Sequence, residues 1–114
     1  MDDIAMVIEI LADALDCHVS TEVPAKRPER LVMVAQTGDT STTLLHTLEV
    51  SLTCWGKNDY DARNLALSAS HALTDAALDH PLLSSAALQS ITRDEWTTTG
   101  QARYLAIMDL VFNV

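Results

Sequence analysis

The chain has 114 residues, of which 48% are hydrophobic and 20% charged, with 3 Gly and 3 Pro. This length and composition are those of one globular domain, and they exclude a disordered or fibrous chain. The 16 Asp and Glu outnumber the 7 Lys and Arg, which gives a net charge of −9 with His neutral. Because nucleic-acid binders need a cationic surface, this charge argues against DNA binding.

The N-terminal segment predicts an amphipathic helix. Apolar residues recur at spacings of three and four from Ile4 to Leu15, opposite Glu9 and Asp13. A short extended piece over 17–21 follows. The two prolines of segment 23–30 then favour an extended connector on the surface.

Two strands are predicted in the middle of the chain. Leu31–Gln36 is rich in β-branched and apolar residues and is expected to stop at a Gly38-Asp39 turn. Residues 44–55 alternate between apolar and mostly polar, which indicates a strand with one buried face. Taken as a strand over 43–55, this segment at ~3.3 Å per residue would span roughly 43 Å. That exceeds the ~26 Å expected for a domain of this size, so the strand should curl or project beyond its own domain.

The second half of the chain predicts one helix and a hairpin. Asn58 or Asp59 can cap a helix that runs to about Leu78, with a narrow alanine-rich buried stripe, and Pro81 ends it. Segment 86–99 alternates weakly, whereas segment 101–114 alternates clearly. Neighbouring strands joined by a short turn are expected to pair as a hairpin.

This order of elements predicts an α+β fold with a single domain over residues 1–114. We expect an antiparallel or mixed β-sheet with two helices packed on one face. No cleavable secretory signal is expected, and no apolar run approaches the ~20 residues of a membrane span. The sequence therefore predicts a soluble protein made in the cytoplasm.

Residues that could carry chemistry are few. No phosphate-binding, nucleophile-elbow or metalloprotease motif occurs, and the four histidines lack the spacing of zinc ligands, so we expect no metal and no cofactor. His46 is interpreted as a hydrogen-bonded buried histidine and Cys54 as an inert buried thiol. The carboxylate pairs Asp59/Asp61 and Asp94/Glu95 could serve acid–base work, but a helix start and a polar strand explain them better.

Apolar residues on the second face of the predicted strands are more informative. Trp55 is expected to point away from the main buried face of its strand, and Leu105, Ile107 and Val111 occupy the second face of the last strand. A second sheet layer or another subunit must cover them. In so short a chain we favour another subunit.

Four passages in order along the chain resemble the small tail terminator, or tail-completion, proteins of long-tailed bacteriophages. They are Val23-Pro24-Ala25-Lys26-Arg27-Pro28-Glu29-Arg30-Leu31-Val32, Leu48-Glu49-Val50-Ser51-Leu52-Thr53-Cys54-Trp55-Gly56, the helix opening Asp61-Ala62-Arg63 and the strand start Arg103-Tyr104. With the N-terminal helix they cover most of the chain. Each passage is weak alone, and their joint order carries the resemblance.

The resemblance implies a structural protein without catalytic residues. Such proteins form a ring, commonly a hexamer, that docks on the major tail tube protein, ends tube polymerisation and meets the head–tail connector. It implies an α+β fold, a place in the virion tail, and DNA contact only during passage through the bore. We expect acidic residues to face the lumen or a partner, with Asp75, Asp79, Asp2 and Asp3 as the candidates.

Two other interpretations remain open. The chain could be a neighbouring connector adaptor or another minor tail component. It could also be a small cytosolic enzyme or ligand-binding domain that uses Cys54, His46 or the aspartate pairs.

Overall fold

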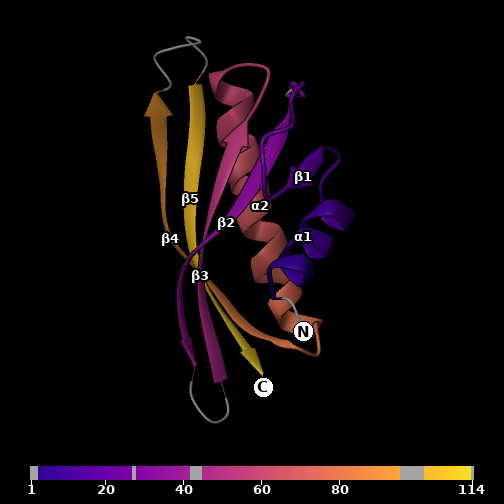
Figure 1. Ribbon diagram of the computed structural model, residues 1–114, viewed down its shortest axis with the longest axis vertical. Coiled ribbons are helices and arrows are strands. Elements are labelled where there is room, and N and C mark those ends of the chain that lie inside the picture. The colour runs from indigo at the N-terminus through magenta and orange to yellow at the C-terminus, as the bar shows by residue number, and fades with distance from the viewer. Residues whose placement is uncertain (1–2, 27, 42–44, 96–101, 114) are drawn as a thin grey trace.

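The computed structural model describes residues 3–26, 28–41, 45–95 and 102–113. It contains two helices and one five-stranded mixed sheet, with both helices on the same side of the sheet, as Figure 1 shows. The elements in chain order are α1 (Asp3–Ala14), β1 (His18–Ser20), β2 (Leu31–Ser41), β3 (Leu45–Trp55), α2 (Asp59–Asp79), β4 (Leu83–Glu95) and β5 (Ala102–Asn113). The predicted α+β class is confirmed.

The sheet has the strand order β1-β2-β3-β5-β4. The three-residue β1 pairs in parallel with the start of β2, and all other neighbours are antiparallel. Helix α2 packs on β3, β5 and β4, while α1 packs on β1, β2 and α2. The opposite face of the sheet carries no helix, and we call it the helix-free face (Figure 1).

The core lies between the sheet and the helices, and the strand alternation produces it. Alternate residues of the two central strands point toward the helices and are buried: Leu48, Val50, Leu52 and Cys54 on β3, and Tyr104, Ala106, Met108, Leu110 and Phe112 on β5. The small residues of α2, such as Ala62, Ala66 and Ala69, are fully buried and bring the helix close to the strands. The predicted alanine-rich stripe therefore forms the helix–sheet contact.

The start of α2 is fixed by its cap, as predicted. The Asn58 side chain accepts a hydrogen bond of 2.8 Å from the Asp61 backbone N–H, which satisfies one of the free donors of the first turn. At the other end the His80 backbone N–H donates to the Ala76 carbonyl, and Pro81 follows. Capping residues and a proline thus define this helix at both ends.

One predicted turn is wrong. Strand β2 does not stop at Gly38-Asp39 but continues to Ser41, because a β-bulge between Gln36 and Gly38 absorbs one extra residue. A Cβ added to Gly38 would lie 3.3 Å from Glu49 Cβ, so glycine suits this crowded position. Strand β4 also begins earlier than expected, at Leu83.

The length of the strands sets the shape of the molecule. The principal-axis extents are 45 × 24 × 23 Å. The four long strands run along the long axis. The end of β2 and the start of β3 extend past the two helices in Figure 1. The expected long strand is therefore accommodated by an elongated domain.

Candidate interaction surface

The helix-free face holds the apolar residues that the sequence places on the second side of the last strand. Leu105, Ile107 and Val111 of β5 are half-buried, whereas Ala106, Met108 and Leu110 between them point into the core. Met33 and Ala35 of β2 lie on the same face. No described element packs over them, because both helices are on the other side. The structure thus leaves a row of apolar side chains along β5 on this face, interrupted by Asp109.

Two carboxylates lie side by side in the middle of this face. Glu49 of β3 and Asp109 of β5 are direct cross-strand neighbours. The Glu49 carboxylate accepts a hydrogen bond of 2.8 Å from the Thr37 hydroxyl and one of 3.3 Å from the Gln89 amide. Like charges directly opposite each other on a sheet are destabilising, and the Thr37 and Gln89 donors offset part of this repulsion.

Trp55 does not lie exposed as expected. It is on the helix-free side of β3 but only 6% exposed, and its cross-strand neighbour Leu31 is fully buried. The Arg103 guanidinium lies 5.5 Å from the centre of the Trp55 ring and donates a hydrogen bond of 2.8 Å to Asp94. Trp55 is therefore a packing residue at the end of the sheet and is not an exposed anchor in the monomer.

The predicted acidic surface divides into two parts. Asp75 and Asp79 are exposed on α2. Asp3 instead contacts His46, and its side chain is 17% exposed. Asp2 lies outside the described residues. Among the candidates that the structure describes, the two α2 aspartates are the exposed ones.

His46 links three elements at the end of the molecule where the chain begins. Its Nε2 contacts the Asp39 carboxylate of β2, and its Nδ1 contacts the Asp3 carboxylate in the first turn of α1. The hydrogen bond with Asp39 is the main cause that raises the pKa of His46, and Asp3 adds to it. His46 is hydrogen-bonded, as predicted, but its side chain is 22% exposed.

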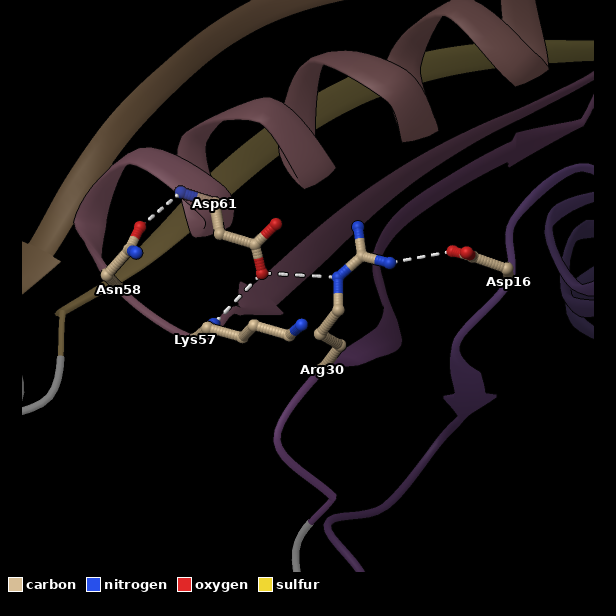
Figure 2. Close-up of polar contacts among 5 residues, drawn as sticks. All are labelled: Asp16, Arg30, Lys57, Asn58 and Asp61. Atoms are coloured by element: carbon tan, nitrogen blue, oxygen red, sulfur yellow. Dashed lines mark hydrogen bonds and ion pairs between the residues drawn. The ribbon is translucent and has the colours of Figure 1, made fainter.

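A second polar cluster joins the connector to the start of α2, as Figure 2 shows. Arg30 donates a hydrogen bond of 2.7 Å to Asp16, after α1, and one of 3.2 Å to Asp61, in the first turn of α2. The same Asp61 oxygen accepts a hydrogen bond of 2.9 Å from the Lys57 backbone N–H. One arginine thus holds the chain before β2 against both the α1 end and the α2 start.

The candidate catalytic residues are placed where they have structural partners. Burial raises the pKa of the Cys54 thiol to about 12, so it is not a thiolate near neutral pH. Asp59 accepts a hydrogen bond of 2.7 Å from Arg93, and this bond is the main cause that lowers the pKa of Asp59. Asp61 is bound by Arg30 and Asp94 by Arg103. The structure does not bring these groups together into one site.

Sequence reasoning missed the Arg30 cluster and the contacts of Glu49. Arg30 and Asp61 are 31 residues apart, and Glu49 and Gln89 are 40 residues apart. Only the strand register and the packing of α2 bring them together, and neither is visible in a single sequence. The local cap of α2 is the part of the Arg30 cluster that a residue pattern could reveal.

No protein-family model and no curated protein matches this chain significantly. In the part of the chain that the structure describes, neither helix combines the length and the apolar character needed to cross a membrane.

Proposed function

We propose that the protein is a phage tail terminator, which forms a ring on the tail tube, ends tube polymerisation and joins the tail to the head connector. The observation that carries this proposal is the helix-free face. Leu105, Ile107 and Val111 have no covering element among the described residues, and a second molecule docked there would bury their remaining apolar surface. The ordered resemblance of four passages supports the particular class of assembly.

In this proposal the protein acts by association and not by catalysis. Its partners are further copies of itself, with a hexameric ring as the expected form, the major tail tube protein and the head–tail connector protein. DNA contacts it only in passage, and no membrane is involved. The protein is made in the host cytoplasm and ends in the virion at the head–tail interface.

The exposed aspartates of α2 have a place in the same proposal. Asp75 and Asp79 are one helical turn apart and repel each other mildly. A bore lined by such carboxylates repels the phosphates of passing DNA, whereas a basic bore would retain them. These residues are therefore suited to line the lumen of a ring, or to form an acidic surface that a partner contacts.

The test is a capping assay with the tail tube protein encoded in the same genome. The purified protein should stop tube elongation, and negative-stain electron microscopy should show a ring at one tube end. Tubes that grow normally in its presence contradict the proposal. Binding to the connector alone would favour the adaptor interpretation.

A matched pair of variants connects this activity to the helix-free face. Ile107→Gln should weaken capping, because it replaces an apolar contact on that face by a polar one. Leu78→Gln is the control, since Leu78 is an apolar residue of α2 that is 86% exposed. Both variants must first show the wild-type circular dichroism spectrum. Equal capping by the two variants would remove the helix-free face from the docking surface.

A further inference from the structure

The sheet has two outer edges that no described strand covers. Strand β1 pairs only with residues 31–33 of β2, so the outer edge of β2 is open from Val34 to Ser41. Strand β4 is last in the strand order, so its outer edge is open along its length. An open edge presents unpaired backbone N–H and C=O groups, which are ready to pair with another strand.

Apart from Asp39 of β2 and the charged end of β4 at 93–95, the two open edges lack the side chains that usually protect edge strands. Residues 84–92 of β4 contain no proline and no charged residue, and Leu88 is 40% exposed. Residues 34–41 of β2 contain no proline, and their single charged residue, Asp39, is bound to His46. Native proteins place lysine or proline at such edges to prevent pairing. Bulges are the one protective device present, and on β4 they leave the stretch Ser85–Leu88 regular.

The two open edges match in position and direction. Following the register across the sheet, Ala35 of β2 is level with Ser90 of β4, and Ser41 is level with Leu83. From Ala35 to Ser41 the open half of β2 therefore lies opposite segment 83–90 at the other side of the sheet, and Val34 is level with Ile91. Strands β2 and β4 also run in opposite directions, since three antiparallel pairings separate them.

We infer that copies of this chain join edge to edge, with segment 34–41 of β2 in one copy pairing antiparallel with segment 83–90 of β4 in the next. When the neighbouring copy is shifted sideways, across the strands, and each of its strands points the same way as in the first copy, these two segments meet. The neighbouring copy does not have to be turned over. The partner is a second copy because each edge is the complement of the other, whereas a foreign strand would satisfy one edge and leave the other open. Repeating this head-to-tail contact closes a ring when each step includes a rotation about an axis along the strands.

This inference deepens the proposed function and rests on it, because it names the surfaces that join the subunits of the ring. Edge pairing uses backbone groups and leaves the side chains of the helix-free face available to the tube protein. The segments are matched in length at eight residues each. An interface of this kind continues the sheet from one subunit into the next.

Two edge-blocking variants test the inference. Ser85→Lys/Ala87→Lys places two lysines on the open part of β4, and Gln36→Lys/Thr37→Lys places two on the open part of β2. All four side chains are exposed, so the folded monomer tolerates the charges, while an approaching strand must desolvate them. The control Ser68→Lys/His71→Lys adds the same number of lysines at exposed positions of α2.

The readout is size-exclusion chromatography with light scattering over about a hundredfold range of concentration. We expect the wild type and the α2 control to form oligomers and each edge variant to remain a monomer. Each edge variant keeps one intact edge, so an equal mixture of the two should form a dimer and nothing larger. Thermal unfolding and circular dichroism establish that every variant is folded.

Three results would overturn the inference. Oligomers that persist in both edge variants would show that the ring is held by other surfaces, and the proposed function would stand. Homodimers of the β2 variant on its own, with no heterodimer in the mixture, would indicate β4-to-β4 pairing. A wild type that stays monomeric throughout would refute spontaneous edge pairing, while the capping assay would judge the terminator role independently.

Discussion

His46 is the residue at which three elements of the fold are held together by charge. Its two ring nitrogens face two different carboxylates, those of Asp3 and Asp39. A neutral imidazole has one N–H donor, so only the imidazolium can donate to both. This geometry and the raised pKa of His46 agree that the folded protein favours the charged form.

The stability of the protein should therefore fall as the pH rises through this pKa. The unfolded pKa of a histidine is 6.5, and the folded value is higher, so the contribution of His46 is complete below 6.5 and is lost as the pH passes the folded value. Urea denaturation at about pH 6 and pH 8.5 should show a smaller free energy of unfolding at the higher pH. In His46→Gln the part of this decrease in unfolding free energy that His46 causes should be absent.

His71→Gln serves as the control, because His71 is exposed on α2. It should retain the wild-type dependence on pH. A His46→Gln protein with an unchanged pH profile would show that the two carboxylates do not depend on the imidazolium.

The connection between β3 and α2 is closely packed around Gly56. A Cβ added to Gly56 would lie 2.4 Å from the Ala62 backbone nitrogen and 2.8 Å from the Asp61 carbonyl carbon. These are backbone atoms of a capped helix, so they cannot move aside as the end of a flexible side chain can. Glycine is needed here for close approach.

Gly56→Ala should destabilise the protein by about 1–3 kcal/mol, the cost of overpacking a close contact. Gly38→Ala is the matched comparison, because its Cβ would meet only the Glu49 Cβ, at 3.3 Å. Urea denaturation should show a clearly larger loss for Gly56→Ala. Equal losses would indicate that the α2 start shifts to accept the methyl group.

Local patterns predicted the elements where one physical effect dominates. Asn58 and Pro81 defined α2, and the alternation of 44–55 defined β3 and its buried face. The end of β2 was missed because Gly38 is common to turns and bulges, and only the partner strand decides between them. The start of β4 was missed because its alternation is weak next to two bulges.

At the scale of the whole molecule, the sequence indicated that a second sheet face remains but not which of its residues are accessible. Leu105, Ile107 and Val111 lie on that face as expected from alternation alone. Trp55 is covered because Arg103 and Leu31 meet it from the two neighbouring strands. Such coverage depends on the register between distant segments, which one sequence does not reveal.

Three arginines and the exposed aspartates Asp75 and Asp79 of α2 lie at opposite ends of the long axis. The described arginines of the sheet and connector, Arg30, Arg93 and Arg103, lie at the end where β3 and β4 finish. Asp75 and Asp79 lie at the C-terminal end of α2, which has no basic residue in its last turn. The negative end of the α2 dipole adds to this acidic region. A ring of parallel copies would concentrate these carboxylates at one level of the assembly.

Reversing this charge tests the role of the acidic region in a completed virion. Asp75→Lys/Asp79→Lys should leave ring formation and tube capping intact, because both residues are exposed on α2 and belong to neither proposed edge segment. Genome delivery should fall by about tenfold or more, since cationic groups in the bore would hold DNA phosphates during passage. Plaque assays and DNA-release kinetics of assembled particles provide the measurement. Asp13→Lys/Glu22→Lys makes the same charge change at exposed positions outside α2 and should deliver DNA normally. If the α2 variant infects as well as this control, the carboxylates of α2 do not line the path of the genome.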